Sequence, residues 1–260
     1  MVQNLRMALR LVALGDSTVE GLMDAGPGET YVGWADRFAD LLARQRGEVL
    51  YANLAVRGQT TAEVLATQLD RAVALRPDVA LFVAGVNDVL HPRLARRELR
   101  RNLLTTYHRL HRSGAAVLTF TVPDMTRVAP LAFALRPRIR YLNEVIREAG
   151  QTEGVSVVDL AAEPFAGHPA LWHDDRLHAN SEGHRRIAAA LAEAHGLDAD
   201  DWRSAPAEPV AAGVLRIVAR EALWVGGHLT PWAWGRLRRQ QYKTGGRCKR
   251  PDLLPVPGAD

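Results

Sequence analysis

Short runs of apolar, often β-branched residues alternate with longer amphipathic stretches along the first 195 residues of the chain. Each short run is apolar on both of its faces, which is typical of a strand buried inside a parallel sheet. The pattern therefore predicts five strands, at residues 9–14, 49–54, 79–84, 116–121 and 155–160.

The stretches between these runs have the period of amphipathic helices. They lie at residues 31–46, 60–75, 93–112, 138–149 and 181–195. Alternation of strand and helix predicts an α/β fold, a three-layer α/β/α sandwich in which helices cover both faces of a five-stranded parallel sheet. In such a sheet, functional side chains gather beyond the carboxyl ends of the strands, and this position is a test for every candidate motif.

The pattern changes after residue 195. One more amphipathic helix is expected at 210–224, followed by a piece rich in tryptophan and arginine and by a proline-rich end. Residues 201–260 carry ten basic and five acidic side chains, whereas residues 1–200 carry 23 and 24. We therefore divide the chain into a globular domain at 1–200 and a C-terminal helical extension with a basic tail at 201–260. A neutral body is not typical of a nucleic-acid-binding fold, so no nucleic acid is expected as a partner.

Composition excludes several chemistries. Lys243 and Lys249 are the only lysines, and neither has the sequence context of a phosphate-binding P-loop or of a Schiff-base enzyme. The single cysteine, Cys248, excludes an intrachain disulfide and a zinc site built from several cysteines. The first 14 residues are typical of a strand and not of a signal peptide, and no stretch has the length of a membrane span, so a cytoplasmic location is expected.

Polar groups and glycines follow the first three predicted strands. Ser17 ends a Gly-Asp-Ser motif after the first strand, Gly58 lies in the loop after the second, and Asn87 follows the third. Each of these alone is typical of an ordinary turn. Because the carboxyl ends of parallel strands meet at one edge, we expect a hydroxyl, an accessible backbone N–H and a side-chain amide to lie together there.

A fourth piece follows the fifth strand. Asp175 and His178 lie three residues apart, just before the predicted helix at 181–195. In a turn, this spacing allows a carboxylate to accept a hydrogen bond from one imidazole nitrogen while the other nitrogen faces a nucleophile. The neighbouring Asp174 is an alternative for the carboxylate. Four weak signals at one edge of one sheet together indicate a serine hydrolase.

Taken in order, these blocks resemble those of the SGNH hydrolases, also called the GDSL esterase and lipase family, over residues 8–195. The resemblance implies a flavodoxin-like SGNH hydrolase fold, and an activity that uses no cofactor and no metal. It implies that Ser17 is the nucleophile and that His178 is the general base and acid. It also implies that Asp175, in preference to Asp174, is the carboxylate that orients the imidazole.

The same resemblance implies an oxyanion hole. Its donors would be the N–H groups of Ser17 and Gly58 and the side-chain amide of Asn87. The chain departs from the family pattern at Thr18, where leucine is usual, and at Ala179, where proline is common. Neither departure replaces a group that takes part in the reaction.

The implied function is that of a serine esterase that cleaves carboxylic esters with acetyl or short acyl groups through an acyl-enzyme. Its partner would be a small-molecule ester. The loop at 122–137 carries Leu131, Phe133 and Leu135. From the position of this loop we expect these three side chains to line an acyl pocket.

Two other interpretations remain open at this point. A metal-dependent hydrolase could use the ligand types in His173, Asp174, Asp175, His178 and His184, although the serine, glycine and asparagine blocks would then have no purpose. Residues 231–250 contain seven basic side chains and no acidic one, so the tail could bind nucleic acid or make weak contact with an anionic membrane surface. The plainer expectation is a helix packed on the body and a solvated tail.

Overall fold

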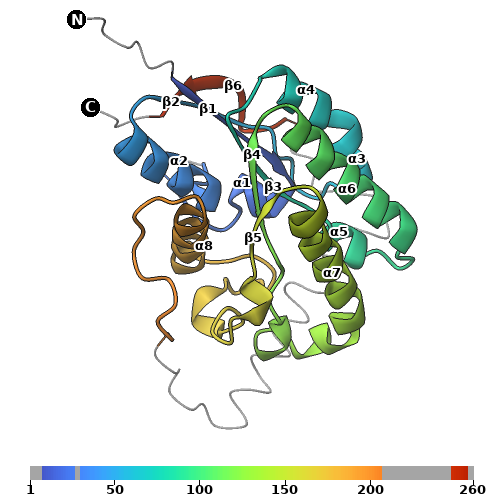
Figure 1. Cartoon of the computed structure of the whole chain (residues 1–260). Coiled ribbons are helices and arrows are strands. Elements are labelled where there is room, and N and C mark those ends of the chain that lie inside the picture. Colours follow the sequence, from blue (N-terminus) through green and yellow to red (C-terminus); the bar gives the residue numbers. More distant parts are fainter. Residues whose placement is uncertain (1–7, 27–29, 207–246, 257–260) are drawn as a thin grey trace, which may run out of the picture.

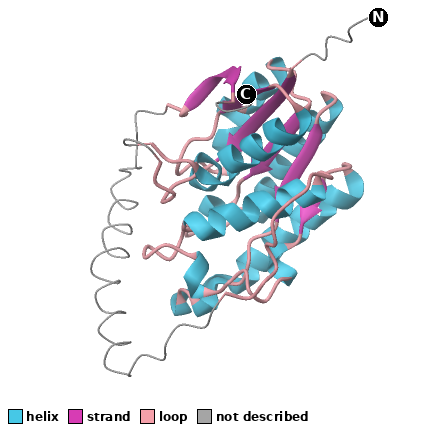
Figure 2. Cartoon of the chain, turned by 90° about the vertical axis from the view of Figure 1, so that its left-hand side faces the viewer, coloured by secondary structure: helices cyan, strands magenta, loops and turns pink. Residues whose placement is uncertain are grey.

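A twisted sheet forms the centre of the protein, with helices on both of its faces (Figures 1 and 2). The computed structural model describes residues 8–26, 30–206 and 247–256. The strand order is β5-β4-β3-β1-β2-β6, and the first five strands are parallel to their neighbours. This confirms the predicted α/β fold with five parallel strands. The strands are β1 (Leu9–Gly15), β2 (Val49–Asn53), β3 (Val79–Val83), β4 (Ala116–Phe120), β5 (Ser156–Val158) and β6 (Arg250–Pro255).

The sixth strand was not predicted. β6 runs antiparallel to β2 at the edge of the sheet, with Tyr51 opposite Leu254 and Asn53 opposite Arg250. Prolines are tolerated in an edge strand because one side of it has no pairing partner, and the two prolines of this segment concealed it in the sequence. The expectation of a solvated tail was therefore wrong for residues 250–255. The predicted helix at 210–224 lies outside the described residues, and the division at residue 200 stays a prediction.

The helices cover both faces of the sheet. α2 and α8 pack on one face, where α2 contacts β2, and α8 contacts β4 and β5. α3, α4, α6 and α7 cover the other face (Figure 1). The helices are α1 (Ser17–Glu20), α2 (Gly33–Arg46), α3 (Thr61–Thr67), α4 (Leu69–Ala74), α5 (Val86–Val89), α6 (Arg96–Arg112), α7 (Arg136–Thr152) and α8 (Ser181–Ala194), with short 3-10 helices at Met125–Arg127, Pro130–Leu135, Leu160–Ala162 and Pro169–Leu171.

The helix predicted at 60–75 is two helices. The break falls at Gln68, whose buried side chain accepts a hydrogen bond from the N–H of Gly15 at 2.8 Å and donates one to the carbonyl of Gly15, also at 2.8 Å. A buried amide group needs hydrogen-bond partners, and these two bonds to the end of β1 satisfy its oxygen as an acceptor and its nitrogen as a donor. A polar side chain thus fixes the backbone directly before Asp16.

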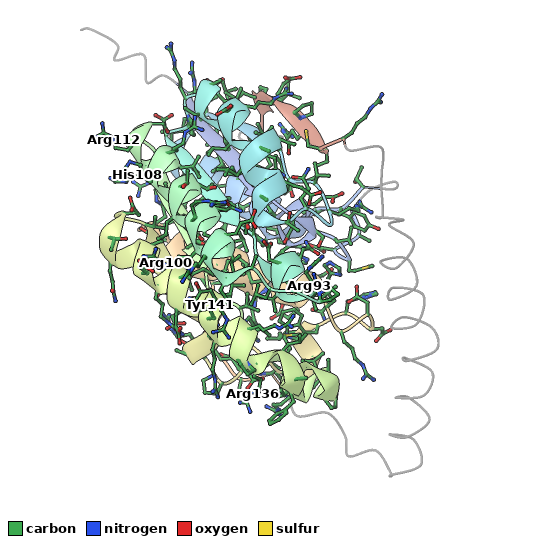
Figure 3. All side chains as sticks on the ribbon, turned by 90° about the vertical axis from the view of Figure 1, so that its right-hand side faces the viewer. Arg93, Arg100, His108, Arg112, Arg136 and Tyr141 are labelled. Atoms are coloured by element: carbon green, nitrogen blue, oxygen red, sulfur yellow. The ribbon has the colours of Figure 1, made fainter. Side chains whose placement is uncertain are left out.

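The outer face of α6 and α7 is polar (Figure 3). Arg100 of α6 pairs with Glu148 of α7, and the guanidinium of Arg96 lies over the ring of Tyr141 at 5.0 Å. The inner face of α6 carries Leu99, Leu103 and Leu110, all at most 1% exposed, as expected of core packing. No helix in the described ranges is both long enough and apolar enough to cross a membrane.

Candidate active site

The predicted site residues come together at the carboxyl edge of the sheet. Ser17 begins α1 directly after β1, Gly58 lies in the loop between β2 and α3, and Asn87 lies in α5 directly after β3. His178 reaches the same edge from the loop before α8. All four residues line one cavity, as does Asp175.

The turn that carries Ser17 is closely packed. Gly15 has φ +148°, and a Cβ at this position would lie 2.1 Å from the carbonyl oxygen of Val83. Only glycine therefore fits where β1 leaves the sheet. Asp16 then caps α1, because its carboxylate accepts a hydrogen bond from the N–H of Thr18 at 3.0 Å. The result is a sharp turn that places Ser17 over the sheet edge.

The side chains of Ser17, His178 and Asp175 form a continuous hydrogen-bonded chain. His178 Nε2 lies 2.9 Å from Ser17 Oγ, and His178 Nδ1 lies 2.7 Å from Asp175 Oδ2. The other carboxylate oxygen of Asp175 accepts the N–H groups of Leu177 and His178, each at 3.0 Å. Asp174 is exposed, so the structure brings Asp175 to the imidazole and not its neighbour.

Asp175 is held in its ionised form. Burial opposes ionisation, but the hydrogen bond and the charge of His178, together with the backbone N–H bonds, outweigh it and lower the pKa of Asp175 to about 2. An ionised carboxylate at Nδ1 keeps the proton on that nitrogen. Nε2 is then free to accept the proton of the Ser17 hydroxyl.

The loop that carries His178 is fixed at both ends. The N–H of His173 donates to the carbonyl of His178 at 2.9 Å, and Trp172 bridges to Ala179. Asn180 caps α8 by accepting the N–H of Gly183 at 3.0 Å. These bonds close a short hairpin-like loop, so the histidine does not depend on its side-chain partners alone for its position.

The three predicted oxyanion donors differ in their present contacts. Gly58 has φ +79° and open space around its Cα, so its N–H lies in a loop that a substrate oxygen can approach. The amide of Asn87 donates to Asp16 Oδ2 at 3.2 Å and to the carbonyl of Gln59 at 3.0 Å. Ser17 supplies the first N–H of α1.

Asp16 is not one of the predicted catalytic residues, but it contacts two parts of the site. It is 1% exposed, and burial raises its pKa to about 6 although Thr18 and His178 stabilise the charged form. It bonds the amide of Asn87 and also shapes the nucleophile turn. Its position directly before Ser17 in the sequence was the available signal.

A second network of buried hydrogen bonds is centred on Asp24. Asp24 is fully buried and accepts bonds from Arg37, from the N–H of Gly33 and from Ser181 Oγ, the last at 2.6 Å. Ser181 is the first residue of α8, so this carboxylate ties the helix behind His178 to the loop after α1. The Arg37 guanidinium and the Ser181 hydroxyl overcome the cost of burial and lower the pKa of Asp24.

The residues proposed as metal ligands in the alternative interpretation do not form a cluster in the described structure. Among residues 8–26, 30–206 and 247–256, no three His, Cys, Asp or Glu side chains are placed to hold a metal ion. His184 is buried, accepts the N–H of Trp34 at 3.2 Å and bonds the carbonyl of Leu22 at 3.2 Å. Burial lowers the pKa of His184 to about 4, so it is a neutral packing residue.

The predicted acyl-pocket residues are only partly confirmed. Leu135 lines the cavity, together with other apolar side chains such as Val122 and Ile139. Phe133 is 67% exposed, and the guanidinium of Arg136 lies 5.6 Å from the centre of its ring, so its assignment to the pocket was wrong. The segment is a 3-10 helix with three residues per turn, so Phe133 and Leu135, two residues apart, face in different directions. The side chain of Leu131 lies outside the described structure.

Solved structures with the same fold span most of the described chain. An acetylxylan esterase from Geobacillus stearothermophilus, solved as a catalytic mutant, has a TM-score of 0.60 at 18% identity, covering 78% of this chain and 100% of that one. An α/β-hydrolase enzyme from the metagenome of Lake Arreo, Spain, has a TM-score of 0.59 at 22% identity, covering 73% and 97%. A lipase/acylhydrolase from Enterococcus faecalis has a TM-score of 0.58 at 24% identity, covering 74% and 99%.

A comparison with curated proteins gave no significant match. A family model described as GDSL-like lipase/acylhydrolase matches residues 13–186, which include all of the residues brought together at the sheet edge. The match begins within β1 and ends within α8, so it covers the end of β1 and all of β2 to β5. The chain belongs to the GDSL-like lipase/acylhydrolase family, whose members hydrolyse ester bonds.

Proposed function

We propose that the protein is a serine esterase that hydrolyses carboxylic esters with acetyl or short acyl groups through an acyl-enzyme on Ser17. The hydrogen-bonded chain from Ser17 through His178 to Asp175 is the observation that carries this proposal. Such a chain supplies what a serine nucleophile needs, since it joins the Ser17 hydroxyl, which lines the cavity, to a base and to a carboxylate that orients the base.

The first half-reaction forms the acyl-enzyme. Ser17 Oγ attacks the carbonyl carbon of the ester while His178 Nε2 takes its proton. The resulting imidazolium is stabilised by Asp175, and it then gives its proton to the departing alcohol oxygen. In the second half-reaction a water molecule loses a proton to His178 and attacks the acyl carbon, which releases the acid and restores Ser17.

The oxyanion donors stabilise the charge that develops on the carbonyl oxygen in both half-reactions. The N–H groups of Ser17 and Gly58 and the amide of Asn87 line the same cavity as the nucleophile. Asp16 orients the amide of Asn87 through their hydrogen bond at 3.2 Å. In this structure the same amide also donates to the carbonyl of Gln59, so the Asn87 side chain must rotate and give up this bond before it can donate to a substrate oxygen.

The preference for acetyl or short acyl groups is supported in two ways. The cavity lining is largely apolar and includes Val86, Leu142 and Leu160, which suits an acyl chain and not a charged group. The fold is similar to that of an acetylxylan esterase, an enzyme named for its action on acetyl esters.

Replacing Ser17 by alanine removes the nucleophile. We expect Ser17→Ala to lower the rate of p-nitrophenyl acetate hydrolysis by about 10⁴-fold or more, with the fold retained by circular dichroism. Ser113→Ala is the matched control, because Ser113 Oγ only bonds the carbonyl of Leu110 at the end of α6. Near-normal hydrolysis by Ser17→Ala would reject the mechanism, and loss of wild-type activity in a chelator would favour the metal-dependent alternative.

Replacing Asn87 by alanine removes one oxyanion donor. We expect kcat for the same ester to fall about 10²- to 10³-fold while KM changes little, because the donor acts on charge that exists only in the transition state. Steady-state kinetics on the folded variant measures both constants. A loss of less than about tenfold would remove Asn87 from the oxyanion hole.

The buried carboxyl of Asp16 makes stability depend on pH. Because burial raises its pKa from 3.8 to about 6, its contribution to the free energy of unfolding is fully present below pH 4 and is lost as the pH rises through 6. Between pH 4 and 7 the wild type loses this contribution and Asp16→Asn does not. We therefore expect the free energy of unfolding of Asp16→Asn, relative to that of the wild type, to rise by up to about 3 kcal/mol over this range. Urea unfolding of both proteins across this range measures it, and a pH-independent difference would contradict the shifted pKa.

Leu135 and Phe133 offer a matched pair for the acyl pocket. Leu135 lines the cavity, whereas Phe133 on the same 3-10 helix is exposed. We expect Leu135→Ala to lower kcat/KM for p-nitrophenyl octanoate more than for the acetate, and Phe133→Ala to change neither by more than about twofold. If Leu135→Ala lowered kcat/KM equally for both esters, Leu135 would not contact the acyl chain.

A further inference from the structure

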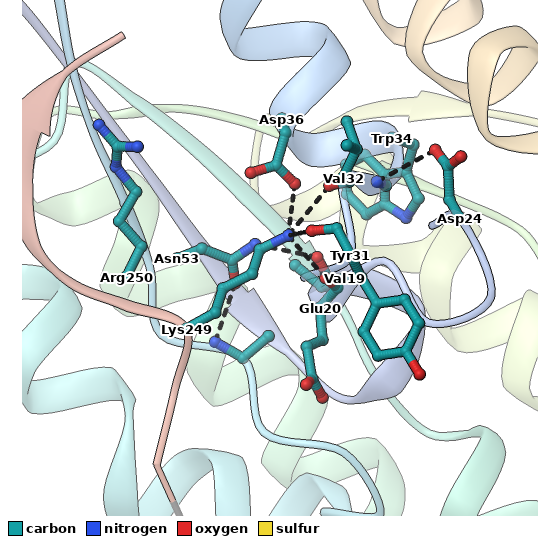
Figure 4. Close-up of polar contacts among 12 residues, drawn as sticks. Val19, Glu20, Asp24, Tyr31, Val32, Trp34, Asp36, Asn53, Lys249 and Arg250 are labelled. Atoms are coloured by element: carbon teal, nitrogen blue, oxygen red, sulfur yellow. Dashed lines mark hydrogen bonds and ion pairs between the residues drawn. The ribbon is translucent and has the colours of Figure 1, made fainter. Parts of the chain in front are cut away.

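Lys249 lies at the centre of a cluster of backbone oxygens behind α1 (Figure 4). Its Nζ donates to the carbonyls of Glu20 at 2.7 Å, Tyr31 at 2.9 Å and Val32 at 2.9 Å, and to Asp36 Oδ2 at 2.5 Å. An ammonium group has three hydrogens, so these four acceptors share them. The sequence analysis counted this lysine in a solvated basic tail, and the structure corrects that expectation.

The burial of this ammonium group is costly and specific. The side chain is 21% exposed, in a chain that has only two lysines. A lysine that served only as a surface charge would keep its ammonium in water. Burial raises the pKa of its partner Asp36 to about 6, although the charge of Lys249 acts in the opposite direction. The cluster therefore ties the residue directly before β6 to the loop between α1 and α2 and to α2 itself.

The carbonyls that Lys249 binds belong to the segments that frame the nucleophile. Glu20 is the last residue of α1, the four-residue helix that begins at Ser17. Tyr31 and Val32 directly precede α2, and Tyr31 lines the cavity. The lysine thus joins the end of the nucleophile helix to one wall of the site.

Glu20 also connects α1 to the loop that contains Gly58, one of the predicted oxyanion donors. The carboxylate of Glu20 accepts the backbone N–H of Arg57 at 3.1 Å and its Nε at 3.0 Å, and Arg57 directly precedes Gly58. The pair is largely buried, since the Arg57 and Glu20 side chains are 18% and 9% exposed. A shift of Glu20 would therefore move both the Ser17 helix and the N–H of Gly58.

We propose that Lys249 is a positioning residue for ester hydrolysis, which holds α1 and, through Glu20, the Gly58 loop in the geometry that activates Ser17. This inference rests on the proposed function. It assigns a role in the reaction to the residue that directly precedes β6, the strand at the edge of the sheet. Lys249 bonds none of Ser17, Asp175 and His178, and the groups that it positions are the nucleophile and an oxyanion donor, so we expect its effect to be on the rate of the chemical step.

The test compares Lys249→Met with Asp252→Ala in the full-length chain. Methionine keeps the length and apolar stem of lysine but donates no hydrogen bonds. Asp252 lies in β6, three residues after Lys249, and is 72% exposed. It pairs with Arg71 at the surface, so its replacement changes β6 without removing a contact to α1. Lys249→Gln, which retains two N–H donors, replaces the methionine variant if that variant does not fold.

Two readouts separate positioning from general stabilisation. The first is the second-order rate constant for labelling of Ser17 by a fluorophosphonate, which needs the activated serine but no particular ester. The second is kcat and KM for p-nitrophenyl acetate, with kcat expressed per serine titrated by the label, so that unfolded molecules are not counted. We expect Lys249→Met to lower the labelling rate and kcat by about ten- to a hundredfold with KM unchanged, and Asp252→Ala to match the wild type.

Each outcome decides one of the two proposals. A labelling rate and a kcat equal to those of the wild type, with only the melting temperature lowered, would make Lys249 a purely structural residue and overturn the inference alone. A raised KM at normal kcat would also overturn it. A wild-type protein whose Ser17 does not react with the fluorophosphonate would reject the proposed function and the inference with it. Non-additive losses in the Glu20→Gln and Lys249→Met double variant would support the route through Glu20.

Discussion

The proposed chemistry depends on one imidazole that bonds two side chains from distant parts of the chain at the same time. His178 contacts Ser17 at 2.9 Å and Asp175 at 2.7 Å. Asp175 is local and moves with the loop, but Ser17 is 161 residues away in sequence, at the end of a different strand. Proton transfer requires this gap to be held within a few tenths of an ångström, so much of the surrounding structure serves to fix two backbone segments relative to each other.

Buried polar groups meet this requirement from several directions. Gln68 binds the backbone of Gly15, Asp16 caps α1, and Asp24 joins the loop after α1 to the start of α8. Lys249 and Glu20 extend the same support to the edge of the sheet. A buried polar group costs free energy unless it is fully bonded, and each of these gains its partners only when the site has its working geometry. Stability and a precise active site are thereby obtained from the same bonds.

The parallel sheet and the candidate site could be predicted from the sequence because their signals are local. Five apolar runs fixed the strands, and the rule that parallel strands end at one edge brought Ser17, Gly58, Asn87 and His178 together. Asp175 was chosen over Asp174 only through resemblance to a family, since the two differ by one position in a turn whose shape is set by Asn180 and the bridge from Trp172 to Ala179.

The features that the sequence did not reveal depend on long-range pairing. The strand at residues 250–255 has two prolines and an edge position, so it lacks the continuous apolar run by which the five parallel strands were recognised. Lys249 is ordinary in sequence and acquires its role only from carbonyls more than 200 residues away. Phe133 was misplaced because hydrophobicity alone does not say which way a 3-10 helix faces.

The central claim, a covalent intermediate on Ser17, is tested most directly by trapping it. Wild-type protein mixed with p-nitrophenyl acetate, quenched in acid within the first turnovers and digested, is analysed by mass spectrometry of the peptide that contains residues 15–20. The account predicts that this peptide carries the mass of one acetyl group, and that the added mass is absent in Ser17→Ala. Hydrolysis of the ester with no acetyl group on Ser17 at any quench time, or with the adduct on another residue, would contradict it.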